Sequence, residues 1–396
     1  MRLVTRDDIE RWAERIDSKG DLPYLMSRLV RATTPASTQA DFPSGSAAYV
    51  GGWDGIVTCQ EDSPFVPKGI SLYEIGTEAD CKGKADKDYD KRTADPLGYN
   101  PKECVFVFVT PRFWKMKDKW VKAKKASGIW KDVRVYDSSN LEQWLDIALA
   151  TSRWFSSRVG SYPFDGIMTA DEFWEEWSTG PNNLILLPEV IISGREIEQQ
   201  KLLSILQGPP SIKGIKASTK NEAIAFIIAV AKKFPVNESD RFFSKSLVID
   251  TEGNFRGIRI NTATQLNLIP RFEETQPLYS AVSKGHHVLV PLGADDNFNQ
   301  ETIILPTIDR DGQVSSLFAS GIIRIDAEKF SRESGRNITI LKKLIGFPHT
   351  KSRWIETENV REIIPALLLG RWDETFTGDI ELIERLTGKP YSEYLP

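Results

Sequence analysis

The chain has 396 residues, of which 27% are charged and 40% are hydrophobic, and its formal net charge is −4. This length is typical of two or three domains, and the longest apolar run, residues 223–231, is about half as long as a bilayer span. The charged N-terminus argues against a secretory signal, and three cysteines without CxxC spacing argue against a zinc site or a disulfide framework. We therefore expect a cytoplasmic protein with no membrane partner.

Histidine is scarce, and its positions restrict the chemistry. The only histidines are His286, His287 and His349, so the first 285 residues contain none. A Ser-His-Asp or Cys-His site, or an HExxH zinc site, cannot be built within that stretch. Catalysis there must use carboxylates, lysines, hydroxyls or a metal ion held by oxygen atoms. The His286–His287 pair is predicted to lie at a strand edge.

The first 160 residues combine short helical and strand-like patterns. Residues 7–16 and 21–33 have the spacing of amphipathic helices, and a connector rich in Ser, Thr and Pro follows them. Further along, we expect strands at 47–57, 69–77, 103–112 and 130–137, and helices at 115–127 and 141–155. This order predicts an N-terminal α/β domain over residues 1–160, with a mixed sheet, one crossover and flanking helices.

A second pattern begins after the linker-like stretch 156–166. Thr169 and Glu172 have capping-box spacing and open a helix. Strands are expected at 183–190, 212–218, 244–250, 266–272, 287–292 and 301–306, with a pronounced helix at 220–234. This alternation predicts a doubly wound, mostly parallel α/β domain over residues 166–315. The remaining pattern predicts a helical extension over residues 316–396.

Two acidic residues are candidates for a metal site. Asp54 lies in the sequence GGWDG where a strand begins, and Glu74 lies on the following apolar strand. Two carboxylates on adjacent strands can converge on Mg²⁺ or Mn²⁺ beside a lysine. The ion would polarise a scissile phosphate and activate water, and the ammonium would stabilise developing charge. The alternative is structural, because GWDG is also an ordinary turn sequence and a strand glutamate can face solvent.

These residues resemble the motif of the PD-(D/E)XK nucleases, the restriction-endonuclease-like superfamily, over roughly residues 20–155. The resemblance implies that Asp54 and Glu74 are catalytic metal ligands. It also implies a lysine two positions after the glutamate, where this chain has Gly76. Lys84, which opens the helical pattern KADKDYDKR, is our preferred replacement, with Lys82 as the second choice. Such sites often take a further acid from the first helix, and Glu14 is a candidate.

A lysine-rich segment follows the third strand. Ten basic and three acidic residues lie between Lys102 and Arg134. The candidate DNA-binding residues are Arg112, Lys115, Lys117, Lys119, Lys122, Lys124 and Lys125. Lysines on one helix face would neutralise phosphates of double-stranded DNA without reading its sequence. The alternative is a helix with solvated lysines and core tryptophans, and Trp120 is predicted to be a core residue.

The segment 207–226 lies where a parallel sheet could hold a phosphate loop. Gly208 and Gly214 are one residue too far apart for a Walker A motif, no Lys follows Gly214, and Pro209 and Pro210 remove two amide donors. The region resembles the P-loop-NTPase-like core of STAND signalling ATPases in pattern only. We therefore expect a regulatory or sensing domain without hydrolysis, and no nucleotide cofactor is assigned to this loop.

Together these features predict a Mg²⁺- or Mn²⁺-dependent DNA endonuclease under the control of a STAND-like region. Fusions of this kind resemble bacterial anti-phage defence proteins, which implies a possible homo-oligomer or a defence-system partner protein. That cellular role rests on analogy. The alternative is a catalytically inactive nuclease-like domain that binds nucleic acid or acts as an assembly scaffold in a larger complex. A signalling NTPase is a third hypothesis.

Overall fold

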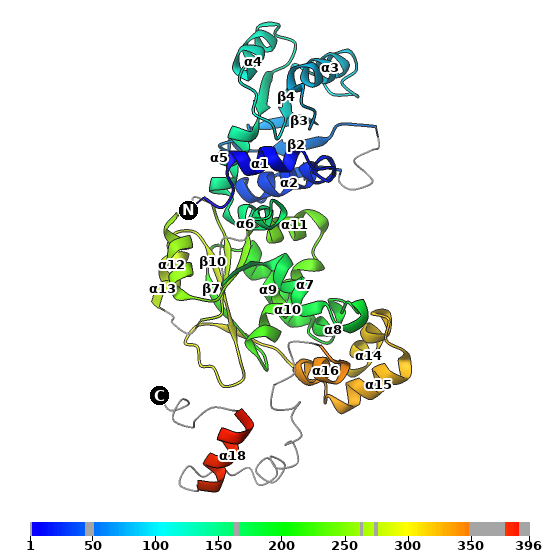
Figure 1. Cartoon of the computed structure of the whole chain (residues 1–396), viewed down its shortest axis with the longest axis vertical. Helices are drawn as coiled ribbons and strands as arrows, with labels where there is room; N and C mark the ends of the chain where they lie inside the picture. The colour runs from blue at the N-terminus through cyan, green and yellow to red at the C-terminus, as the bar shows by residue number, and fades with distance from the viewer. Residues whose placement is uncertain are drawn as a thin grey trace. The chain divides into compact units, whose positions relative to one another are not determined.

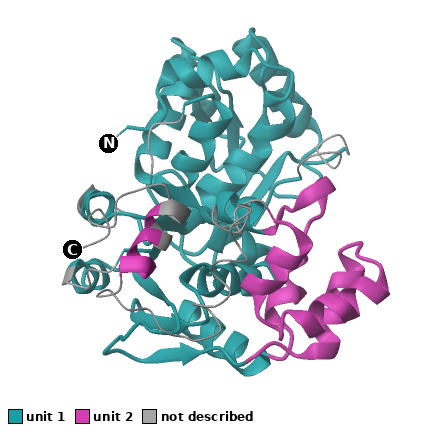
Figure 2. Cartoon of the chain, turned by 60° about the horizontal axis from the view of Figure 1, so that its bottom comes forward, with its two compact units in different colours: residues 1–177, 195–306 teal, residues 178–194, 307–396 magenta. Residues whose placement is uncertain are grey.

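The computed structural model describes residues 2–43, 51–161, 166–261, 264–272, 276–347 and 377–387. Its fold belongs to the α/β class, and the described strands form two separate sheets. The chain divides into two compact units, one made of residues 1–177 and 195–306 and the other of residues 178–194 and 307–396 (Figure 2). Both sheets belong to the first unit. Within the described residues, no helix is long and apolar enough to cross a bilayer.

The first sheet has five strands in sequence order, of which Figure 1 labels β2, β3 and β4. They are β1 (Gln39–Asp41), β2 (Gly55–Cys59), β3 (Gly69–Ile75), β4 (Cys104–Val109) and β5 (Asp132–Tyr136). The pairs β1–β2 and β2–β3 are antiparallel, whereas β3–β4 and β4–β5 are parallel. Each parallel pair needs a crossover, and these are α3 (Cys81–Ala94) and α4 (Lys117–Ala126). The prediction of a single crossover was therefore wrong, because the sequence analysis did not count α3 as a connection.

Strand β4 separates two hydrophobic cores. All six of its residues are buried, and successive side chains point to opposite faces. Val105, Val107 and Val109 pack in one core with α1 (Arg6–Ala13), α2 (Ser18–Thr33), α5 (Ser138–Ile147) and α6 (Leu149–Arg158). Phe106 and Phe108 pack in the other core with α3 and α4. The helix expected at 141–155 is broken at Ala148, whose backbone is not helical. Of the strand expected at 47–57, residues 47–50 lie outside the described residues.

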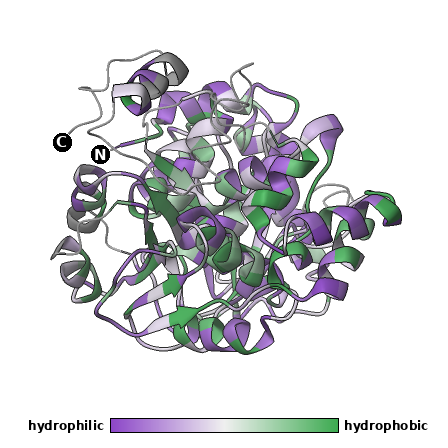
Figure 3. Ribbon diagram, turned by 90° about the horizontal axis from the view of Figure 1, so that it is seen from below, coloured by the Kyte–Doolittle hydropathy of each residue, from purple (hydrophilic) through white to green (hydrophobic). Residues whose placement is uncertain are grey.

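The second sheet has the order β11-β7-β10-β9-β8-β6, and only β6 is antiparallel to its neighbour. Its strands are β6 (Ile167–Thr169), β7 (Ile212–Lys216), β8 (Ser246–Ile249), β9 (Asn267–Pro270), β10 (His287–Leu292) and β11 (Thr302–Ile304). The helices of this part are α7 (Ala170–Ser178), α9 (Glu196–Gln207), α10 (Lys220–Lys232), α11 (Val236–Lys245), α12 (Glu252–Asn261) and α13 (Gln276–Val282). Every residue of α10 from Glu222 to Ala231 is buried. Among the described residues, the strands of the sheets are mostly hydrophobic, as the green ribbon in Figure 3 shows.

The second unit is helical where it is described. It contains α8 (Glu189–Ile192), α14 (Arg310–Ala319), α15 (Arg324–Glu333), α16 (Ile338–Ile345) and α18 (Thr377–Thr387). The strand expected at 183–190 does not form: a single bridge joins Thr179 to Ile185, and Pro188 then caps the short helix α8. Residues 348–376 and 388–396 of the expected helical extension lie outside the described residues.

Candidate active site

Strands β2 and β3 bring Asp54 and Glu74 to the same end of the first sheet. In their antiparallel register Gly55 pairs with Tyr73. Asp54, which precedes Gly55, therefore lies opposite Glu74, which follows Tyr73. The Asp54 amide donates to the Tyr73 carbonyl at 3.0 Å, and the Ile75 amide donates to Asp54 Oδ2 at 2.7 Å. Both predicted acids therefore line one pocket of about 250 Å³.

The glycine that follows Asp54 is required by packing. A Cβ at Gly55 would overlap the ring of Phe42, which lies in the core on that face of the sheet. Gly55 is not among the described residues with a positive φ. The GWDG sequence thus reflects the close approach of an aromatic ring to the backbone, rather than a left-handed turn. This packing fixes the start of β2 immediately after Asp54.

Helix α3 supplies the cationic side of the pocket. Lys84, Asp88 and Arg92 follow one another at four-residue intervals and therefore share one helix face. Lys84 Nζ lies 2.8 Å from Asp88 Oδ2. Arg92 donates to Glu74 and to the Gly52 carbonyl, and its guanidinium lies 4.7 Å from the ring centroid of Trp53. Arg92 and Asp88 were not among the predicted site residues, although their four-residue spacing from Lys84 was a usable signal.

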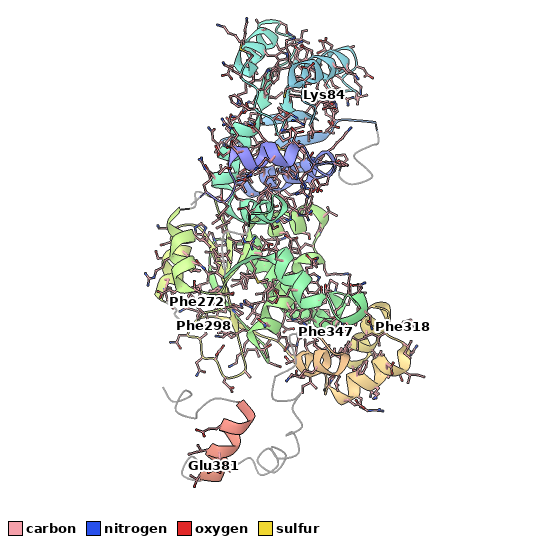
Figure 4. The ribbon with its side chains drawn as sticks, viewed as in Figure 1. Lys84, Phe272, Phe298, Phe318, Phe347 and Glu381 are labelled. Atoms are coloured by element: carbon pink, nitrogen blue, oxygen red, sulfur yellow. The ribbon has the colours of Figure 1, made fainter. Side chains whose placement is uncertain are left out.

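The side chain of Lys84 occupies the space above Gly76. A Cβ at Gly76 would lie 2.7 Å from Lys84 Cγ and 3.2 Å from Lys84 Cε. Lys84 also lines the pocket together with Asp54 and Glu74, and Figure 4 shows its position on α3. Lys82, the second-choice lysine, is exposed and pairs instead with Asp86 at 2.7 Å. Glu14 is not a lining residue of this pocket, and its carboxylate pairs with Arg112.

Burial perturbs the two acids of this pocket. Desolvation, reinforced by the negative charge of Asp54, raises the pKa of Glu74 to about 7 in spite of the bond from Arg92. Desolvation also raises the pKa of Asp54, partly offset by the bond from the Ile75 amide. Burial alone would lower the pKa of Lys84, but the hydrogen bond and the charge of Asp88 raise it. The pocket therefore holds a charged ammonium beside two carboxyl groups that are hard to ionise together.

The donor set partly fits a divalent cation. Hard carboxylate oxygens are the ligands that Mg²⁺ prefers, and the mutual repulsion of Asp54 and Glu74 would be relieved by added positive charge. Against this, Arg92 already pairs with Glu74. Among the described residues, no group of three or more His, Cys, Asp or Glu side chains has the arrangement of a metal site. The fit of this pocket to a divalent cation therefore depends on the carboxylates of Asp54 and Glu74 alone.

The basic segment divides into paired and unpaired side chains. Lys117 and Lys125 form ion pairs at 2.6 Å with Asp137 and Asp132, respectively. Lys124 lies 3.2 Å from Asp86, and Arg112 donates to the Thr77 carbonyl at 2.7 Å.

Lys115, Lys119 and Lys122 are exposed and have no ion-pair partner in the part of the chain that the structure describes. Trp114, Trp120 and Trp130 are buried, which confirms that Trp120 is a core residue. Of the seven predicted DNA-binding residues, these three lysines are therefore available for phosphate.

The end of the segment 207–226, in which the sequence lacks a Walker A motif, lies at the carboxyl end of the second sheet. Thr219 caps α10, and Lys220, Asp250 and Arg271 line an open pocket there. Arg271 makes a two-pronged contact with Asp250, at 2.6 and 2.8 Å. His286 and His287 are buried at the start of β10.

Comparison with known families and with curated proteins found no match for this chain. The α/β class and the pocket containing Asp54, Glu74 and Lys84 are therefore the observations from which function is inferred.

Proposed function

We propose that residues 1–160 form a metal-dependent deoxyribonuclease of the PD-(D/E)XK type, controlled by a STAND-like region in anti-phage defence. The observation that carries the proposal is the position of Lys84 over Gly76. In the nuclease motif a lysine follows the glutamate by two residues, and a lysine reaching across Gly76 from α3 can present its ammonium beside Glu74. The mixed sheet with α3 and α4 as crossovers is compatible with this family.

Each residue has a distinct role in the proposed reaction. Asp54 and Glu74 would hold Mg²⁺ or Mn²⁺, which when bound supplies Lewis-acid polarisation of the scissile phosphodiester. Lys84 would orient the attacking water and stabilise negative charge on the phosphate. Asp88 keeps the Lys84 ammonium charged and positioned through its 2.8 Å ion pair. Lys115, Lys119 and Lys122 would bind the DNA backbone.

A nuclease-like scaffold without activity is the second candidate, because Arg92 occupies one oxygen of Glu74. The pair is buried, with side-chain exposures of 4% and 5%. An arginine in this position can satisfy the charge of Glu74 without any metal ion. In that case the domain would bind nucleic acid or a partner protein and would not cleave.

The two candidates differ in their response to Mg²⁺. We expect the full chain to nick supercoiled plasmid with MgCl₂ or MnCl₂, and we expect Asp54→Asn and Glu74→Gln to abolish nicking. Thermal unfolding provides a second readout that does not require an active state, since a ligand that binds only the folded protein raises Tm. Mg²⁺ should raise the Tm of the wild type and not that of either variant. DNA binding with neither nicking nor a Mg²⁺-dependent Tm shift would instead identify the scaffold.

A further inference from the structure

A second pocket lies at the opposite edge of the second sheet from Asp250 and Arg271. Its volume is about 330 Å³, within the range of small-molecule sites. We call it the amino-edge pocket, because Lys245 directly precedes β8 while Asn267 and His287 are the first residues of β9 and β10. The register aligns these starts, since Asn267 pairs with both Ser246 and His287.

The polar side of the amino-edge pocket is cationic. Lys245, Arg241 and His287 line it. Within the described residues, the Lys245 ammonium has neither a hydrogen bond nor an ion pair, and His287 Nδ1 is buried without a hydrogen-bond partner. Glu238 is the one acid among the described lining residues, and it accepts a bond from Gln207 Nε2 at 3.3 Å.

Arg241 adds positive charge, and no carboxylate in the described part of the chain forms an ion pair with it. Its guanidinium donates to three backbone carbonyls, those of Arg31 at 2.9 Å, Thr34 at 2.7 Å and Thr38 at 3.2 Å. Burial, reinforced by the charge of Arg241, lowers the pKa of Lys245 to about 8. Lys245 is therefore mostly protonated at neutral pH although its surroundings disfavour the charge.

The opposite wall of the pocket is apolar. Leu203 and Leu206 of α9 contribute to it, together with Phe234 and Phe242. Pro35 and Ala36, from the turn that follows α2, close one side. The pocket thus lies where the first and second sheet-bearing parts of this unit meet, and pockets at such junctions are common ligand sites.

We propose that the amino-edge pocket binds a small molecule with an anionic head group, phosphate or carboxylate, on an aromatic or apolar body. The head group pairs with Lys245 and Arg241 and accepts a hydrogen bond from His287, and the body packs against Leu203 and Phe242. Binding supplies the counter-charge that none of the described residues provides at Lys245. This inference is independent of the proposed nuclease activity.

Calorimetric titration of the full chain tests the site. Phenyl phosphate and benzoate serve as probes for the two head groups, and phenol serves as the uncharged control. We expect at least one anion to bind with one-to-one stoichiometry, and Lys245→Met to weaken that binding tenfold or more. Lys201→Met, which removes an exposed charge from α9, should leave it unchanged. Equal binding of phenol, binding of neither anion, or equal affinity in Lys245→Met would each overturn the proposal.

Thermal unfolding shows whether Lys245→Met loses binding because it lacks the lysine or because it does not fold. Lys245→Met removes a half-buried charge for which the described residues supply no partner, so its Tm should equal or exceed that of the wild type. The bound anion should raise the Tm of the wild type and of Lys201→Met, and not that of Lys245→Met. A clear loss of stability in Lys245→Met would show that Lys245 has a structural partner, and the proposal would then be wrong.

Discussion

Lys84 and Gly76 are complementary in space: a Cβ at position 76 would lie 2.7 Å from Lys84 Cγ. Gly76 follows Glu74 by two residues, and alternate residues of an extended chain project to the same side. The absence of a side chain at position 76 leaves room for a lysine from α3 on the side where Glu74 lies. The Asp88 carboxylate then holds that lysine at 2.8 Å.

This relationship predicts that a lysine can be moved between the two positions. Lys84→Ala should lower plasmid nicking by roughly 10²- to 10³-fold, the usual cost of losing a charge-stabilising donor. The double variant Lys84→Ala with Gly76→Lys should recover part of the loss, because residue 76 lies on the same side as Glu74. Lys87→Ala, an exposed lysine of the same helix, is the matched control. Full activity of Lys84→Ala would refute the assigned role.

The pKa of Glu74 predicts a specific dependence of stability on pH. Because it is raised from 4.5 to about 7, the native protein retains a proton that the unfolded chain releases between these values. The resulting stabilisation is complete below pH 4.5 and is lost as the pH rises through 7. We expect the unfolding free energy of the wild type, relative to Glu74→Gln, to fall by about 3 kcal/mol over this range. Urea denaturation at several pH values measures the difference, and parallel curves would contradict it.

The three unpaired lysines predict salt-dependent DNA binding. Replacing Lys115, Lys119 and Lys122 by Ala should weaken binding to duplexes of any sequence. Each lost phosphate contact lowers the slope of log K against log salt by about 0.9, so the triple variant should lose about 2–3 units of slope. Fluorescence anisotropy over a KCl series provides the measurement. The control variant replaces three other exposed lysines, Lys201, Lys284 and Lys329, by Ala. An equal loss of slope in that variant would show that the effect comes from net charge and not from contacts at Lys115, Lys119 and Lys122.

We expect substitution of Arg28 to lower the stability of the protein. Its side chain is 2% exposed, and it donates to Asp171 Oδ2 at 2.9 Å and to the Phe243 carbonyl at 2.6 Å. Arg28→Met leaves both acceptors without this donor. Because the Asp171 side chain is 33% exposed, water can solvate it, and the loss of the charged donor should cost about 2–3 kcal/mol. Arg11→Met removes an exposed helical pair and should cost at most about 1 kcal/mol. Urea denaturation of both variants should separate them clearly; similar midpoints would contradict the buried role of Arg28.

Features that depend on neighbouring residues, or on strands adjacent in the chain, could be predicted from the sequence. Alternation and helical spacing identified β3, β4, β7 and α10, because burial on one face imposes a period that can be counted. Asp54 and Glu74 could be paired in advance, since consecutive strands joined by a short connection usually lie side by side. The strand expected at 183–190 failed for the opposite reason: Leu186 and Val190 are buried in a unit whose described elements are all helices, while Ile185 is exposed.

Which charged side chains meet depends on long-range packing and could not be predicted from spacing. The pairing of Arg92 with Glu74 and the choice of Lys84 over Lys82 depend on how α3 rotates when its apolar face packs against Phe106. The amino-edge pocket likewise joins Pro35 to Lys245 and His287, residues far apart in the chain. Sequence spacing fixes the face of an element on which a residue lies, but long-range packing fixes what that face contacts.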